Sequence, residues 1–446
     1  MNFSFADYKG HYHALARLGT PLILGQIGFI FQNFADTLMI GHHSTIELAA
    51  ASLVSNIYML GILMSMGFAL CLTPVVGTFY GQGKTEAIGG TMKNGVMVNT
   101  LAAALLVAVF TILYFFLDRL GQPEELLPYI RPYYLINLVS LPFICWLNCY
   151  KQVFDATTDT RTPMWILLGG NALNVWGNWL LIYGNWGCPE LGLVGAGLST
   201  LAARIIMFVL IVWIFFGAKR YHAIRQAYHR SGWNIRDMRH LIALGTPISL
   251  QMGMESGAWS LCSIIVGWIG TEALAGHQVM LTISQLFYQF YYALAAAVAI
   301  RVSHFYGQKD YQAIARAAWA GFHLNFIIAL LISVPVYIFR RELGYLFTDS
   351  DEVANIVAMT IIPLIVYQFS DAFQVIFSNV LRGITYVNPM IIVAFVSYFV
   401  VSIPLAYLFG ITWEGHLIGV WYSFPFGLSI AGVLYYYYYR KRSRTF

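Results

Sequence analysis

The chain has 446 residues, of which 59% are hydrophobic and only 10% are charged, and its mean hydropathy is +0.66. A soluble globular protein carries about 25% charged residues, so this composition excludes a cytosolic enzyme, a disordered regulator and a nucleic-acid-binding protein. The formal net charge of +5 is small and bears on orientation in a membrane, not on an anionic partner. The composition predicts an integral membrane protein with several spans.

Twelve apolar stretches are long enough to cross a bilayer, which takes roughly 20 residues of helix. Helices are expected because lipid offers no hydrogen-bond partner to the backbone and the alternating pattern of barrel strands is absent. The stretches lie near residues 15–40, 49–79, 91–117, 130–153, 163–184, 192–216, 240–268, 275–305, 317–338, 355–379, 389–409 and 416–438. We therefore predict an all-α integral membrane fold with twelve transmembrane helices.

The two halves of the chain repeat each other at a constant offset of 226 residues. Leu18–Pro21 recurs as Leu244–Pro247, and Phe79–Gln82 recurs as Phe305–Gln308. Six helices per half is an even number, so both halves insert the same way up and form a parallel repeat. We predict an N-terminal six-helix lobe (1–216), a cytoplasmic linker (217–239) rich in Arg and Lys, and a C-terminal six-helix lobe (240–446).

The basic residues predict the orientation. If the N-terminus lies inside, the inner segments hold twenty Lys and Arg residues, whereas the outer loops hold only Arg119, Arg131, Arg340 and Arg341. This bias follows the positive-inside rule, which places both termini in the cytoplasm. Arg204, within the sixth stretch, is the only cation expected at membrane depth.

Three carboxylates lie well within apolar stretches: Asp36 in the first, Glu255 in the seventh and Asp371 in the tenth. An acid at membrane depth costs several kcal/mol unless it is protonated, paired or solvated, so each is a candidate functional residue. The alternative is a purely structural ion pair, for which Arg204 is the available partner. One arginine cannot neutralise three acids on three helices.

Polar and aromatic residues lie on the same helix faces as these acids. This pattern favours a water-accessible cavity, although asparagine stripes also join helices in membranes. The residues are Gln32 and Asn33 beside Asp36, Gln251 and Trp259 beside Glu255, Tyr367, Gln368 and Gln374 beside Asp371, and the fifth-stretch stripe Asn171, Asn174 and Asn178.

Such acids can hold a proton, because burial disfavours the ionised carboxylate. They can also bind Na⁺ with amide and carbonyl oxygens, and Glu255 and Asp371 are the pair we expect to do so. An organic cation needs the same carboxylates, and Trp259, Tyr288 and Tyr292 could add cation–π contacts or serve only in packing. No nucleotide-binding motif, HExxH or nucleophile elbow occurs, so transport is expected to be ion-driven or passive, with no cofactor.

The chain resembles the multidrug and toxic compound extrusion (MATE) transporters of the NorM-like branch. The motifs that carry the resemblance are Leu18–Pro21, Phe34–Gly41, Tyr80–Gly83, Asp159–Met164 and Leu381–Gly383. It implies a V of two six-helix lobes that open alternately to either side, with Asp36, Asn174 and Asn178 in an N-lobe network. It also implies a C-lobe cation site at Glu255, Asp371 and Tyr367. Trp259 stands where that branch often has Phe.

We therefore expect an antiporter in the bacterial cytoplasmic membrane that exports small organic cations, driven by Na⁺ or H⁺, and that works as a monomer without nucleic acid. One alternative is a lipid-linked saccharide flippase of the same superfamily, which should line its cavity with basic residues. An intramembrane transferase is a further alternative and would need a catalytic His or a Cys–His pair.

Overall fold

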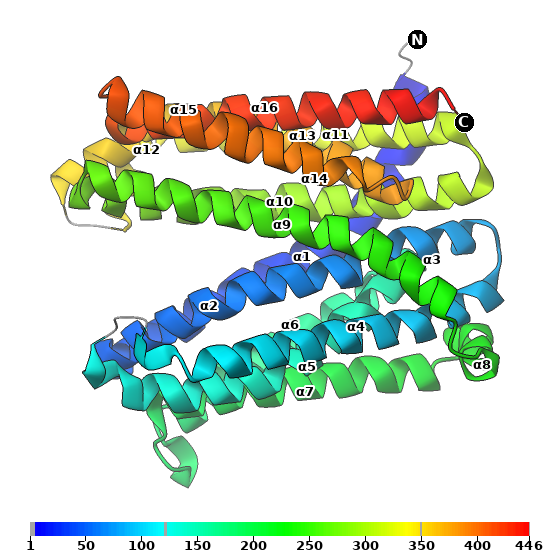
Figure 1. The fold of residues 1–446 in the computed structure, drawn as a ribbon, viewed down its shortest axis with the longest axis horizontal. Coiled ribbons are helices and arrows are strands. Elements are labelled where there is room, and N and C mark those ends of the chain that lie inside the picture. Colours follow the sequence, from blue (N-terminus) through cyan, green and yellow to red (C-terminus); the bar gives the residue numbers. More distant parts are fainter. Residues whose placement is uncertain (1–4, 120–122, 348–349, 446) are drawn as a thin grey trace. The chain divides into compact units, whose positions relative to one another are not determined.

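The computed structural model describes residues 5–119, 123–347 and 350–445. These residues form helices joined by turns, with no β-strand among them (Figure 1). The long helical segments are α1 (Phe5–His43), α2 with α3 (Thr45–Leu70, Leu72–Gly81), α4 (Thr85–Tyr114), α5 (Leu127–Ala156), α6 (Arg161–Leu181), α7 (Gly192–Gly217), α9 (Ile235–Ile269), α10 (Thr271–Gln308), α11 (Tyr311–Ile338), α13 (Asp351–Gly383), the segment 389–412, and α16 (His416–Ser443).

Each of the twelve predicted stretches corresponds to one of these segments, and ten of the segments are long and apolar enough to cross a membrane. The two that fall short in mean hydropathy are α6 and α9. Helix α6 carries three asparagines, and α9 carries Gln251 and Glu255. The polar residues that make these helices candidates for function are therefore the ones that lower their hydropathy.

The segment 389–412 is not a regular α-helix. It consists of α14 (Pro389–Ala394), a π-helical stretch η5 (Phe395–Ser402), α15 (Ile403–Tyr407) and a second π-helical stretch η6 (Leu408–Thr412). Ser402 Oγ donates to the Ser397 carbonyl at 2.9 Å within the first stretch. Such π turns are rare and often mark functional positions, and this one carries Tyr398.

By its internal contacts the chain divides into two compact units. Unit 1 comprises Met1–Ile23 and Leu250–Phe446, and unit 2 comprises Leu24–Ser249. The two boundaries fall inside α1 and α9 and are separated by the repeat offset, so each lies the same distance after Pro21 or Pro247. The predicted lobes 1–216 and 240–446 and the linker 217–239 describe the order of the repeat along the chain and stay a prediction.

In unit 2, the predicted linker contains a short helix, α8 (His222–Arg230), that packs on α4. Lys93 Nζ on α4 donates to the Ser231 carbonyl at 2.6 Å, and the Asn234 backbone N–H donates to Asn94 Oδ1 at 3.1 Å. A Cβ on Gly89 would lie 2.5 Å from the Ile224 carbonyl oxygen, so only glycine permits this close approach.

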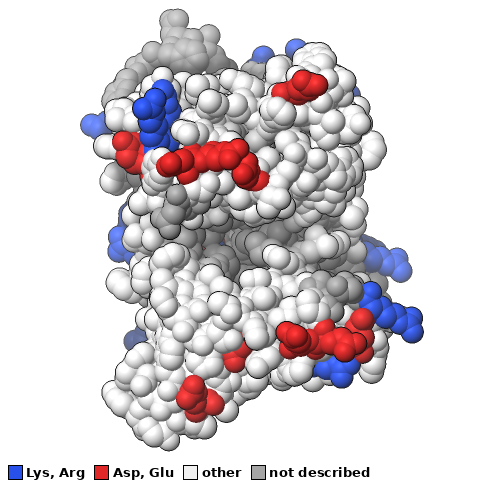
Figure 2. Space-filling view, turned by 90° about the vertical axis from the view of Figure 1, so that its left-hand side faces the viewer, with Lys and Arg blue, Asp and Glu red and all other residues white. Residues whose placement is uncertain are grey.

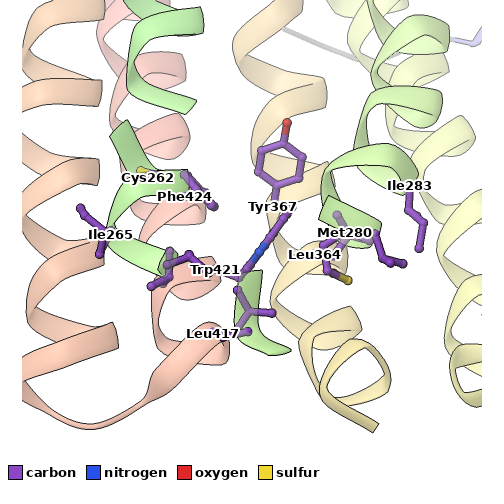
Figure 3. Close-up of a cluster of buried hydrophobic side chains, with 14 of the residues drawn as sticks. Cys262, Ile265, Met280, Ile283, Leu364, Tyr367, Leu417, Trp421 and Phe424 are labelled. Carbon is purple, nitrogen blue, oxygen red and sulfur yellow. The ribbon is translucent and has the colours of Figure 1, made fainter. Parts of the chain in front are cut away.

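In unit 1, α13 lies against α10, α11 and α16 (Figure 1). A cluster of buried apolar side chains from α9, α10, α13 and α16 fills the space between them, including Cys262, Met280, Leu364, Trp421 and Phe424 (Figure 3). This packing fixes the inner part of α13, where Tyr367 and Asp371 lie.

Exposed acids gather at the helix ends seen in Figure 2. The exposed acids in the corresponding loops and helix ends of the sequence are Asp118, Glu124, Glu125 and Glu190 in unit 2, and Glu272, Glu342, Asp351, Glu352 and Glu414 in unit 1. All of them belong to segments predicted to lie outside.

Candidate cation sites

Asp36 in unit 2 lies against the asparagines of α6. Asn178 Nδ2 donates to Asp36 Oδ1 at 2.5 Å. When its amide nitrogen faces the acid, Asn174 donates to the same oxygen at 2.8 Å, and its own oxygen lies 3.1 Å from the Thr200 hydroxyl. Asn178 Oδ1 is buried and has no hydrogen-bond partner among the described residues. The network therefore offers a carboxylate and an amide oxygen, and both can bind a hard cation. The carboxylate can also take up a proton.

Of the other residues expected near Asp36, the structure places some beside the carboxylate and others away from it. Gln32 lies beside the carboxylate and the Asn174 amide. Asn33 is exposed, and no hydrogen bond joins it to Asp36 in the described structure. Arg204 acts on Asp36 electrostatically but makes no direct salt bridge with it, and its guanidinium donates to Ser140 Oγ instead. A simple ion pair with Arg204 therefore does not account for Asp36.

Glu255 in unit 1 is held by a relay that the sequence did not suggest. Gln251 Nε2, one helical turn earlier on α9, donates to Glu255 Oε2 at 2.9 Å. Arg382 Nη2, in the last turn of α13, donates to Gln251 Oε1 at 2.6 Å. Arg382 is only 5% exposed and lies within a candidate membrane span. The sequence did not predict a buried cation at this place, and the expectation that Arg204 is the sole cation at membrane depth stays a prediction.

Asp371 on α13 is 1% exposed, and its Oδ2 has no hydrogen-bond partner among the described residues. Its charge acts on that of Glu255, so the two carboxylates form one electrostatic unit. Asp371 is buried and Glu255 is partly buried, and a proton or a cation would relieve both their mutual repulsion and their loss of hydration.

Tyrosines from several helices surround the carboxylate pair. Tyr367 and Tyr288 interact electrostatically with both acids. Tyr398, from the π-helical stretch, lies beside Glu255, and Tyr435 on α16 is near Glu255 and Arg382. The hydroxyls of Tyr398 and Tyr435 have no hydrogen-bond partner in the described structure. The site is therefore lined by neutral oxygens that are free to accept from a hydrated ion or to contact a cation.

Tyr367 joins the acids to the apolar core. Its ring packs on Trp421 and Trp259, with centroids 6.1 and 5.8 Å apart. Figure 3 shows its hydroxyl pointing away from Trp421 and Leu417. The core thus holds the ring while the polar end is left for the site.

The remaining aromatic residues expected in a substrate cavity lie in different surroundings. Trp259 stacks on Phe424 with ring centroids 4.3 Å apart and belongs to the packed cluster. Tyr288 stacks on Tyr292 with ring centroids 5.8 Å apart and interacts electrostatically with both acids. A groove of about 800 Å³ elsewhere on unit 1, lined by apolar residues of α9 and the segment 403–412, contains none of the residues expected in the cavity.

The unpaired polar atoms around Asp371 show what this site can hold. Gln368 Nε2 and Gln374 Oε1 are buried without partners among the described residues, in addition to Asp371 Oδ2. Buried polar atoms are rarely left unsatisfied, so water, a proton or an ion is expected there. The oxygen ligands described here, with one pair of hard carboxylates and no cysteine or histidine among them, fit a monovalent cation better than a transition metal.

These features define a class: a multi-pass membrane protein with a parallel helical repeat, buried acids in both units and no nucleotide-binding motif, as in secondary transporters. A protein-family model described as MatE matches residues 21–180 and 247–408, once in each repeat. The chain therefore belongs to the MatE family of membrane transporters, which are not enzymes.

The relatives extend the match over the whole chain. It is 28% identical to the multidrug resistance protein NorM of Aliivibrio fischeri, over 96% of this chain and 94% of the relative. The values are the same for NorM of Vibrio cholerae.

Solved structures show the same fold. An outward-facing multidrug resistance MATE family transporter of the MOP superfamily matches with a TM-score of 0.90, at 19% identity, over 98% of this chain and 96% of that one. The eukaryotic MATE transporter AtDTX14 matches with a TM-score of 0.87, at 17% identity, over 98% of both chains.

Proposed function

We propose that this chain is a multidrug efflux antiporter that exports small organic cations by alternating access, in exchange for Na⁺ or H⁺ entering the cell. The observation that carries the proposal is the carboxylate pair of unit 1, because Asp371 is almost fully buried with one oxygen unpaired and lies within the electrostatic reach of Glu255. The names of the NorM relatives agree with drug export.

Competition for charge supplies the coupling. An ion that binds at Glu255 and Asp371 neutralises the negative charge that would hold a cationic drug. Drug and ion then prefer different states of the protein or exclude each other from one site, which is the condition for coupled exchange. Tyr367 and Tyr288 supply neutral oxygens and aromatic faces to the same site, and aromatic faces attract organic cations.

The Asp36 network of unit 2 is a second site for the coupling ion. Asp36 and Asn178 supply the oxygens, Asn174 donates to the carboxylate, and Asn178 Oδ1 has no hydrogen-bond partner in the described structure. A proton on Asp36 or a Na⁺ among these oxygens would relieve the cost of an anion in a mostly apolar helix bundle.

The distribution of charge supports an orientation with both termini in the cytoplasm. Nine exposed acids of the described structure lie in the predicted outer segments, which hold only four of the 25 Lys and Arg residues, and translocated loops are poor in Lys and Arg. With NorM of two bacteria among the relatives, the bacterial cytoplasmic membrane is the proposed location, with a monomer as the working unit.

Transport of ethidium by purified protein in liposomes tests the proposal. An imposed Na⁺ gradient and an imposed pH gradient are compared for the wild type and for Asp371→Asn. Acceleration by one gradient in the wild type, absent from the variant, is expected and names the ion. Gradient-independent behaviour of the wild type would contradict antiport and would favour lipid flipping.

A further inference from the structure

Arg382 is the one cation that the described structure links to the acids of unit 1. Its Nη2 contacts Gln251 Oε1 at 2.6 Å, and Gln251 passes the contact on to Glu255 through a bond of 2.9 Å. Its charge acts on Glu255 directly as well. A buried guanidinium is costly without a negative group nearby, and Glu255 is the carboxylate to which Gln251 connects it.

The charges in this cluster can be counted. Glu255 and Asp371 carry one negative charge each when ionised, and Arg382 carries one positive charge at any accessible pH. The other described groups that interact with them are neutral side chains: Gln251, Tyr288, Tyr291, Tyr367, Tyr398 and Tyr435. The net charge of the ionised cluster is therefore −1, and one monovalent cation or one proton brings it to zero.

The geometry distinguishes the two acids. Glu255 is tied through Gln251 to Arg382 and keeps its charge partner in place, whereas Asp371 has an oxygen without a partner. Because Gln251 lies between the two groups, Arg382 reduces the negative charge of the cluster from −2 to −1 without binding to the Glu255 carboxylate itself. Asp371 is left as the acid whose charge an incoming ion must neutralise.

We propose that Arg382 is a resident counterion that limits the Glu255–Asp371 pair to a single exchangeable monovalent cation or proton. This proposal rests on the proposed function, since it assigns the number of ions that this site takes. Arg382 acts through Gln251 and the local field, so it is a positioning residue and not an ion ligand.

Binding of radioactive Na⁺ by detergent-purified protein tests the count, with proton uptake in Na⁺-free solution measured in parallel. All variants carry Asp36→Asn, which removes the carboxylate of unit 2. Counting predicts a net charge of 0 for Glu255→Gln, −2 for Arg382→Gln, and −1 again for the double variant. Charge partners change the affinity of such groups about tenfold or more.

We expect one ion per protein in the parent and at least tenfold weaker binding in Glu255→Gln. Binding should return to the parental level in Glu255→Gln/Arg382→Gln, because the net charge is restored although a carboxylate is missing. Arg382→Gln alone should bind a second ion or bind the first more tightly. If Arg382→Gln does not fold, the comparison of Glu255→Gln with the double variant still shows whether the net charge of the cluster determines ion binding.

Two results would overturn the inference. A double variant that binds as weakly as Glu255→Gln would show that Glu255 acts as a ligand and that Arg382 sets no count. The control is Arg301→Gln, which removes a half-buried arginine stacked on Phe305 in the same unit. If Arg301→Gln changed ion binding as much as Arg382→Gln does, the effect of charge would not be local to the Glu255–Asp371 pair. Failure of the proposed function gives a different pattern, in which Glu255→Gln and Asp371→Asn both bind ions as the parent does.

Discussion

A carboxylate that is 1% exposed and lacks a partner on one oxygen, as Asp371 does, is not a stable anion without compensation. Packing alone would favour an apolar residue at this place on α13. The surrounding tyrosines and amides are also incompletely satisfied. At the scale of single residues, we therefore propose that this group of polar side chains holds a proton, an ion or water.

Asp371→Asn should remove the response of stability to the coupling ion. The wild type should gain thermal stability when Na⁺ is added or when the pH is lowered, because binding to the native state at 100 times the dissociation constant contributes about 2.7 kcal/mol. The variant keeps the shape of the protonated acid and should gain much less. Melting curves in detergent check this, and an undiminished gain in the variant would contradict the role of Asp371.

Asn178→Leu should destabilise the protein more than Asn171→Leu, one to two turns earlier on α6. Asn178 is fully buried and donates to Asp36 at 2.5 Å, and a hydrogen bond to a charged group contributes about 1.5–3 kcal/mol. Asn171 is also buried but has no bond to Asp36. Chemical denaturation measures the difference, and an equal loss for both variants would remove Asn178 from the network.

Some of the site could be predicted from the sequence and some could not. Asp36, Glu255 and Asp371 stand out because a charge within an apolar stretch is visible in one dimension, and Gln251 follows from the spacing on one helix. By sequence, Arg382 is one of the twenty Lys and Arg residues of the predicted inner segments. Nothing in the residues next to it in the sequence predicts that its side chain contacts Gln251 on α9. The positions of Tyr398 and Tyr435 beside Glu255 could not be predicted either, because periodicity shows which residues share one face of a helix and not which helices are in contact.

At the scale of elements, a docked helix lies within the segment that we predict to be a linker. Segment 217–239 is rich in Arg and Lys, yet its helix α8 buries Ile224 and Ala227 and packs on α4. The amphipathic spacing of those two residues is a signal for the docking, but the glycine that receives the helix lies more than a hundred residues away. The need for glycine at position 89 therefore becomes visible only in the folded structure, where α8 packs against it.

Gly89→Val should release α8 from α4. A Cβ there would lie 2.5 Å from both the Ile224 carbonyl oxygen and the Tyr228 nitrogen, which are backbone atoms that cannot turn aside. Trypsin should then cleave faster after Arg225 and Arg230. Gly169→Val on α6 is the control, since a Cβ at Gly169 meets nothing within 4 Å, and equal cleavage rates for the two variants would contradict the docking.

At the scale of the whole chain, the repeat preserves the fold and not the chemistry. Both the family match and the unit boundaries follow the 226-residue offset. The position equivalent to Asp36 in the second half is Cys262, and the position equivalent to Asp371 in the first half is Cys145, both buried. The two units have therefore kept the same helices while placing their acids at positions that are not equivalent in the repeat, and a repeat found in the sequence predicts the first of these facts alone.

The predicted orientation can be checked by labelling single cysteines in a background from which the five native cysteines are removed. Glu414→Cys and Arg444→Cys both place the thiol on exposed positions in unit 1. In intact cells a membrane-impermeant maleimide should react with Glu414→Cys only, and with Arg444→Cys only after the membrane is opened. The reverse pattern would show that the basic tail lies outside.

The most direct test of the account is whether a cationic drug displaces the coupling ion from the protein. Purified protein in weakly buffered detergent is titrated with ethidium while released protons and released radioactive Na⁺ are measured. The account predicts that ethidium binding releases protons or Na⁺, and that Asp371→Asn greatly reduces the release. Ethidium that binds without releasing either ion would contradict a shared carboxylate site.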